Sequence, residues 1–274
     1  MMTNYITGPP VSHSCIAIKK NGELFVVESN LPGVRIWKYK EFVEHFKKEN
    51  NTIMWFQLSK ENRKKFNETA VWEWLEPRKK FKYGIRAFLP APIDLAQGTF
   101  PKYISNELFI LIGTVLNKFI PDLSNLVIGA FMSARLGRDD LNLDETSILA
   151  SEMNLKLEDL MAMPELESFK YKAGEQWICS ALVVKLYMIA GVIKEDINPK
   201  EFVPKDIYQM NIFDKNWKYN KPKVCRDADP DDDFCQIHGK YRLHAVNFSR
   251  IDVYPRMNER CAMVPPKYLR QDGC

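Results

Sequence analysis

The chain has 274 residues, of which 46% are hydrophobic and 12% aromatic, so it is long and apolar enough to bury a sizeable core. Its 39 basic and 35 acidic residues leave a net charge of +4, too even a balance to indicate a nucleic-acid partner. The composition therefore excludes a disordered chain and argues against nucleic-acid binding.

The first predicted element is a β-hairpin over Ser12–Ser29. Asn21 and Gly22 form its turn, because both residues tolerate the positive φ angles of a type I′ turn, and apolar or β-branched residues flank them. A two-residue turn places Cys15 opposite Glu28. The hairpin is the most sharply predicted part of the chain.

The register of this hairpin brings polar residues together. It places His13 opposite Asn30 and diagonal to Glu28, and the alternation of side chains along a strand puts these residues and Cys15 on one face. A histidine beside a carboxylate or an amide is the base and orienting group of a nucleophilic triad. We expect Glu28 to orient His13, with Asn30 as the alternative.

Helices and one strand are predicted after the hairpin. Lys40–Asn50 and Glu61–Trp74 have helical periodicity, and Asn51–Leu58 between them is typical of a strand. Residues 90–170 contain several helical runs separated by proline and glycine, which indicates a helical insertion.

The most lipid-like stretch is Leu108–Phe131. Lys118, Pro121 and Asp122 interrupt it, so its uncharged run is well short of the ~20 residues that a membrane-spanning helix needs. We expect helices of the core here and no membrane span.

A long apolar helix is predicted over Gln176–Gly191, with Gly191 just past its end. Cys179 is near its start and heads the buried stripe that continues through Leu182, Val183 and Leu186. Partial positive charge and free N–H groups at a helix start lower the pKa of a thiol and can hold an oxyanion. Cys179 is therefore the candidate nucleophile, and Cys15 is the second choice.

The other cysteine, histidine and acidic residues are expected to have structural rather than catalytic roles. A lone cysteine in a hydrophobic helix is usually structural, and His45, His238 and His244 are expected to be structural or solvated. The acidic run Asp227–Asp233 lacks the glycine and the glutamate of a calcium loop, so we expect a solvated loop and no metal site.

Four of the six cysteines lie in the loop-rich C-terminal part of the chain. Two disulfides are the simplest reading, Cys225–Cys235 and Cys261–Cys274, although other pairings are open, and the spacing does not favour zinc. Together with Asn-x-Ser/Thr sequons at Asn50, Asn67 and Asn247, the cysteines favour a secretory, lysosomal or extracellular location, although the first residues contain no signal-peptide pattern.

The order histidine, acid, cysteine, seen in "SHSCIAIKKNGELFVVES" and "WICSALVVKLYMIAGVI", resembles the circularly permuted papain-like amidases of the NlpC-type, YiiX-like superfamily. The tail with its cysteines is similar to that of an uncharacterised eukaryotic branch. The resemblance implies His13 as general base, Glu28 as orienting residue and Cys179 as nucleophile, and gives Ser180 no chemical role. Members usually have a Gly-Asp strand before the histidine, which is missing here, so we expect a truncated chain or the loss of a core strand, with activity impaired if that strand is absent.

The resemblance implies an α+β papain-like fold, with a small antiparallel sheet packed on the helix that carries the nucleophile and with the helical insertion. The expected domains are a catalytic domain at 1–200, with the insertion at about 90–170, and a C-terminal extension at 201–274. The expected function is a cysteine amidase or peptidase that forms a thioacyl intermediate on a peptide or acyl substrate without a cofactor. A thiol acyltransferase or lipid hydrolase, and an inactive binding protein, are the alternatives.

Overall fold

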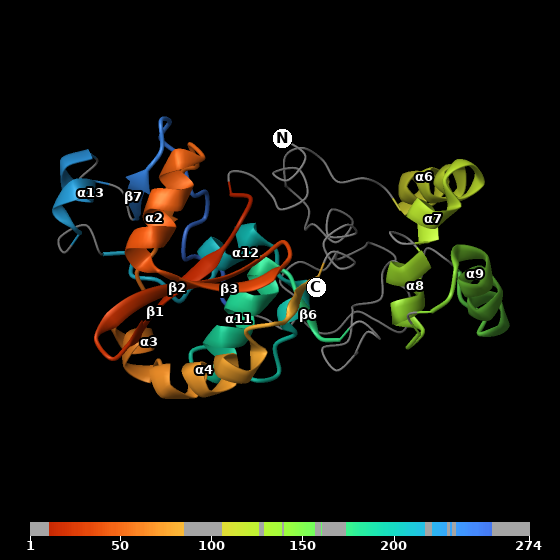
Figure 1. Cartoon of the computed structure of the whole chain (residues 1–274), viewed down its shortest axis with the longest axis horizontal. Helices are drawn as coiled ribbons and strands as arrows, with labels where there is room; N and C mark the ends of the chain where they lie inside the picture. The colour runs from red at the N-terminus through yellow and green to blue at the C-terminus, as the bar shows by residue number, and fades with distance from the viewer. Residues whose placement is uncertain are drawn as a thin grey trace.

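The computed structural model describes residues 11–84, 106–125, 129–138, 140–156, 160, 174–216, 221–228, 231 and 234–253. It is an α+β structure built around a curled five-stranded sheet (Figure 1). The strands of this sheet, in spatial order, are β1 (Cys15–Lys20), β2 (Glu23–Asn30), β3 (Gly33–Lys38), β5 (Lys82–Tyr83) and β6 (Gln176–Trp177).

The hairpin of β1 and β2 has the register predicted from its turn. Cys15 pairs with Glu28 and Lys20 with Glu23, while Asn21 and Gly22 have positive φ angles of 51° and 81°. Because glycine has no Cβ and asparagine tolerates this conformation, the turn is unstrained. The predicted register is confirmed from Cys15 to Glu28, but β1 begins at Cys15, so the expected pairing of His13 with Asn30 is wrong, and Asn30 pairs with Gly33 of β3 instead.

The sheet is mixed, so the prediction of a small antiparallel sheet is confirmed for three of its strand pairs and wrong for the fourth. The pairs β1–β2, β2–β3 and β3–β5 are antiparallel, but β5 and β6 run parallel. More than ninety residues separate these two short strands, and a connection of that length permits a parallel crossover.

Helix α11 (Cys179–Ile189) packs on one face of the sheet and is the centre of the core (Figure 1). Its predicted first turn is instead strand β6, so the helix begins three residues later than expected, at Cys179. It ends as expected, with Gly191 at φ 77° after Ala190. The core around it includes Ile16, Ile18, Val27, Val71, Leu75, Leu182, Val183 and Leu186.

The other face of the sheet is partly covered by α2 (Tyr39–Lys48), which contacts β2 and β3. The helix predicted over Glu61–Trp74 is two helices, α3 (Lys60–Lys65) and α4 (Glu68–Leu75), because Asn67 caps the second one. Its side-chain oxygen accepts a hydrogen bond from the Ala70 N–H at 3.0 Å. The 3₁₀ turn η1 (Glu76–Arg78) follows α4.

Helices also form within the predicted insertion: α6 (Asn106–Phe119), α7 (Pro121–Ser124), α8 (Ala130–Arg135) and α9 (Leu143–Glu152) (Figure 1). The expectation that the apolar stretch of α6 and α7 is buried is wrong for four of its side chains, since Leu111, Val115, Phe119 and Ile120 are exposed. Among the described residues no helix is both long and apolar enough to cross a bilayer.

A second, two-stranded sheet joins β4 (Ile53–Trp55) to β7 (Cys235–His238). The elements η3 (Pro199–Glu201), α12 (Pro204–Gln209) and α13 (Lys223–Ala228) lie between α11 and β7 in the chain. The predicted disulfide Cys225–Cys235 links α13 to β7 and is confirmed. Cys261 and Cys274 lie outside the described residues, and the predicted domain boundaries remain predictions.

Candidate functional site

The start of α11 is held at the edge of the sheet by backbone and side-chain hydrogen bonds. The Trp177 carbonyl accepts from the buried Ser29 hydroxyl at 2.7 Å and from the Gly84 N–H at 3.0 Å. Ser29 adjoins Glu28 on β2, and Trp177 is two residues before Cys179. The short strand β6 therefore brings Cys179 to the end of the hairpin, although the two are far apart in the sequence.

Cys179 is the first residue of α11 and is only 3% exposed. Ile178 precedes it as N-cap and has no side chain that accepts a hydrogen bond from the helix. N–H groups in the first turn of a helix have no partner within the helix, and they favour negative charge nearby. The thiol thus lies where a thiolate and an oxyanion are both stabilised.

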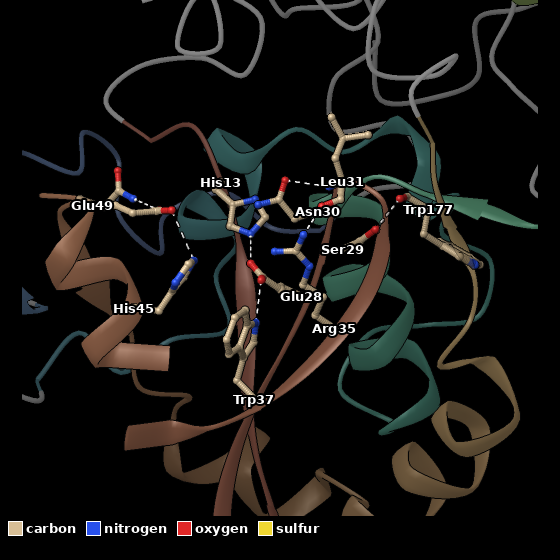
Figure 2. A network of polar contacts seen from close by, with 11 residues as sticks. His13, Glu28, Ser29, Asn30, Leu31, Arg35, Trp37, His45, Glu49 and Trp177 are labelled. Carbon is tan, nitrogen blue, oxygen red and sulfur yellow. Dashed lines mark hydrogen bonds and ion pairs between the residues drawn. The ribbon is translucent and has the colours of Figure 1, made fainter. Parts of the chain in front are cut away.

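His13, two residues before β1, forms a close pair with Glu28 of β2. The ring nitrogen Nε2 of His13 lies 2.7 Å from Oε2 of Glu28, whose side chain is fully buried, whereas the His13 side chain is 26% exposed (Figure 2). A carboxylate removed from water needs a hydrogen-bond donor at each oxygen. His13 supplies one of these donors.

The second donor comes from β3. The indole Nε1 of Trp37 donates to Oε1 of Glu28 at 2.8 Å, so both carboxylate oxygens are bonded (Figure 2). Burial by itself raises the pKa of Glu28, but the hydrogen bond and charge of His13, the Trp37 donor and the positive charge of Arg35 outweigh it and lower the pKa. Glu28 is therefore an ionised, buried carboxylate.

The other partner of His13 is Cys179. Since Nε2 faces Glu28, the second ring nitrogen, Nδ1, is left for the thiol, and the two side chains interact by hydrogen bonding and charge. Burial acts against an imidazolium, but the negative charges of Cys179 and Glu28 and the hydrogen bonds to both raise the pKa of His13 to about 10. The structure thus brings together Cys179, His13 and Glu28.

The same neighbours act on the thiol of Cys179. Burial alone raises its pKa, yet the charge and hydrogen bond of His13 lower it overall, and the backbone N–H and hydroxyl of Ser14 act in the same direction. A raised pKa at His13 beside a lowered pKa at Cys179 favours charge separation between the two side chains, a thiolate next to an imidazolium.

The alternative residues have other surroundings. Asn30, the alternative orienting residue, accepts a hydrogen bond from the Leu31 N–H at 2.9 Å. Cys15 is a free, exposed cysteine opposite Glu28. Desolvation by the chain around its thiol, and then the negative charges of Glu28 and Cys179, raise the pKa of Cys15 to about 12. These surroundings favour the neutral thiol at Cys15.

Four residues of the site were missed in the sequence: Ser14, just before β1, and Trp37, Arg35 and Tyr83. Trp37 and Arg35 lie on β3, which was not predicted, although "GVRIWK" alternates in the period of a strand and would have placed both on one face. Tyr83 on β5 is near enough to Cys179 that the thiolate, after burial, raises the pKa of the phenol. No sequence signal points to Tyr83, because a two-residue strand is too short for periodicity.

Two further features complete the description of the site. Within the described part of the chain, no group of three or more histidine, cysteine, aspartate or glutamate side chains is arranged to hold a metal ion. His45 on α2 stacks on Trp37 with ring centroids 5.0 Å apart and pairs with Glu49 at 3.4 Å, so it is a neighbour of the network.

No protein-family model, curated protein or solved structure matches this chain. The site therefore has to be interpreted from its own geometry.

Proposed function

We propose that the protein is a cysteine-dependent hydrolase of amide bonds, built on a circularly permuted papain-like fold, with Cys179, His13 and Glu28 as its triad. The observation that carries this proposal is the placement of His13 between a buried carboxylate and a thiol at a helix start. Each group is the chemical type that its place requires: a nucleophile, a base and an orienting anion.

The first half of the reaction forms a thioacyl intermediate. The Cys179 thiolate attacks the carbonyl carbon of the substrate, and the backbone N–H of Cys179 stabilises the oxyanion that develops. The His13 imidazolium then gives its proton to the amide nitrogen as the C–N bond breaks and the amine leaves. Glu28 holds the ring in place and stabilises its positive charge.

The second half consumes water. His13, now neutral, takes a proton from a water molecule whose oxygen attacks the thioester carbonyl carbon. The C–S bond breaks, the acid product leaves, and the thiolate–imidazolium pair is restored. A substrate with a peptide-type amide or another activated acyl group satisfies this chemistry, and no cofactor takes part in it.

Alkylation by iodoacetamide tests the proposal, with each cysteine followed separately by mass spectrometry between pH 5 and 9. We expect Cys179 to react fast at pH 6 and to slow by about tenfold or more in His13→Ala, because the variant removes the charge that lowers the thiol pKa. A small free thiol such as N-acetylcysteine is the reference, because the raised pKa of Cys15 makes that thiol slower than an ordinary one. Alkylation of Cys179 no faster than that of the free thiol at pH 6 would contradict the triad and favour a non-catalytic binding protein.

A thiol acyltransferase or lipid hydrolase is the second candidate. The exposed apolar side chains Leu111, Val115, Phe119 and Ile120 on α6 and after it favour it, since such a surface can meet acyl chains. Transfer of an acyl chain from an activated lipid ester to Cys179, with no turnover of peptide amides, would favour this candidate over the amidase.

We also propose that the protein enters the secretory route, to a lysosomal or extracellular location. Disulfides persist in oxidising compartments, and the Cys225–Cys235 bridge fits that rule. The asparagines of all three sequons, Asn50, Asn67 and Asn247, are exposed.

A further inference from the structure

Glu28 is a buried anion whose second oxygen is not used by the triad. Its side chain is fully buried, so each carboxylate oxygen needs a donor from the protein. His13 occupies Oε2, and Trp37 donates to Oε1 at 2.8 Å from the neighbouring strand (Figure 2). The carboxylate of Glu28 is therefore held between the imidazole of His13 at one oxygen and the indole of Trp37 at the other.

Trp37 is itself held from two sides. Its strand pairs with β2, where Trp37 lies opposite Val26 and Arg35 lies opposite Glu28. Its ring stacks on His45 of α2, with an interplanar angle of 21° and centroids 5.0 Å apart. A donor fixed both by a strand register and by ring stacking holds its N–H in one direction, which is what an orienting group needs.

We propose that Trp37 is a positioning residue, whose indole N–H fixes the Glu28 carboxylate in the orientation that holds His13 against Cys179. This inference rests on the proposed function and adds a fourth member, which acts only through Glu28. It assigns Trp37 no contact with substrate.

The bond has a directional effect on titration. The Trp37 hydrogen bond favours the ionised form of Glu28, whether or not His13 carries its proton. Removal of this bond should therefore raise the pKa of Glu28 and leave the pKa of His13 nearly unchanged. In the pH dependence of Cys179 alkylation, the acid midpoint should therefore move to higher pH, whereas the alkaline limb should stay in place. The charged or titratable groups around Glu28 are His13, Cys15 on β1, Arg35 on β3 and, beyond Trp37, His45 on α2 and Glu49 just after it.

Trp37→Phe removes the N–H and retains an aromatic ring to stack on His45. Trp72→Phe is the matched control, since the Trp72 indole also donates a partly buried hydrogen bond, at 2.8 Å, but to the neutral carbonyl of Lys19. Both variants lose a tryptophan N–H bond within or against the same sheet. Only Trp37→Phe leaves a buried carboxylate oxygen without its donor.

Two readouts are measured in the full chain. The first is the titration of the Glu28 side-chain carboxyl by ¹³C NMR, with the resonance assigned from its loss in Glu28→Gln. The second is the acid midpoint of Cys179 alkylation by iodoacetamide. We expect Trp37→Phe to raise the Glu28 midpoint by about one pH unit, the scale of a hydrogen bond to a charged group, and to move the acid midpoint of Cys179 in the same direction.

Trp72→Phe should change neither midpoint, and adding Trp37→Phe to Glu28→Gln should produce no further shift for Cys179. Equal Glu28 midpoints in the two tryptophan variants would overturn the inference. A shift at Glu28 that leaves the acid limb of Cys179 in place would also overturn it. Failure of the proposed function is visible separately, as a wild-type Cys179 that reacts like an ordinary thiol.

Discussion

At the scale of single residues, the neighbours of each side chain decide its chemistry more than its type does. Cys15 and Cys179 are both free thiols near Glu28, yet the pKa of one is raised and that of the other is lowered. The difference is His13, whose positive charge lies beside Cys179 and supports a thiolate there. Proximity to an anion alone makes a thiol less reactive.

Ser180 offers a residue-scale test of a role that is only structural. Its buried hydroxyl donates to the Phe202 carbonyl at 2.5 Å, and it adjoins the nucleophile without belonging to the triad. Ser180→Ala should lower the free energy of unfolding by about 1 kcal/mol, the usual cost of a lost hydrogen bond. Chemical denaturation measures this change.

The same variant should leave the alkylation rate of Cys179 at pH 6 within about twofold of wild type. A loss of reactivity as large as that expected for His13→Ala would show that Ser180 takes part in the chemistry.

At the scale of elements, the short helix α12 contains a buried acid that the proposed reaction does not use. Asp206 accepts a hydrogen bond from the Val203 N–H at 2.8 Å and so caps the helix start. Burial raises the pKa of Asp206 to about 7, against the smaller opposing effects of this bond and of Lys205. The start of α12 is thus capped by a carboxyl group whose protonated form is favoured by burial.

The sign of this shift predicts a pH dependence of stability. A pKa that is higher in the folded than in the unfolded state contributes stability that is fully present below the unfolded value and is lost as pH rises through about 7. Asp206→Asn keeps an acceptor for Val203 and removes the charge, so its unfolding free energy should not show this loss. At pH 8 we expect it to exceed wild type by on the order of 2 kcal/mol.

Denaturant unfolding at pH 5 and pH 8 measures this difference, and Asp206→Ala is the control. Without an acceptor for Val203, Asp206→Ala should be less stable than Asp206→Asn at both pH values, by about 1 kcal/mol. A wild-type stability that does not fall between pH 5 and 8, relative to Asp206→Asn, would contradict the prediction.

At the scale of the whole molecule, the two sheets are stabilised in different ways. The five-stranded sheet is packed on α11 by a broad apolar core. The two-stranded sheet of β4 and β7 is backed by the disulfide Cys225–Cys235, packed with Ile237. An isolated pair of strands is marginal in water, so the disulfide has more to contribute there.

Removal of this disulfide should therefore destabilise the protein without altering the site. Its cysteines are ten residues apart, and closing a loop of that size contributes about 3 kcal/mol in the chain-entropy model. We expect the double substitution Cys225→Ser and Cys235→Ser to lower the unfolding midpoint in a thermal scan. Reduction of the wild-type protein should have a similar effect.

Because Cys179 begins α11 and His13 lies just before β1, both outside the two-stranded sheet, iodoacetamide should still modify Cys179 fast at pH 6 in this variant below its unfolding midpoint. A slow Cys179 in a folded variant would show that the two sheets are coupled.

Much of the candidate site could be predicted from the sequence, because its parts follow local rules. The turn at Asn21-Gly22 determines the register that pairs Cys15 with Glu28, and the apolar stripe from Cys179 predicts a buried helix. Alternation in "GVRIWK" carries the same kind of signal for β3, which was overlooked. These features depend on residues close together in the chain, where backbone geometry limits the choices.

Only the tertiary structure decided how those parts meet. The parallel pairing of β5 with β6, and the bond from Ser29 to the Trp177 carbonyl, bring the start of α11 to the end of the hairpin across about 150 residues of chain. The clamp of Trp37 on Glu28, and the mixed rather than antiparallel sheet, arise from the same long-range pairing. The sequence by itself determined the local elements and the chemical types of side chain available. Burial and charge pairing between distant segments decided which thiol lies beside His13, because neither effect has a period that can be recognised along one strand or helix.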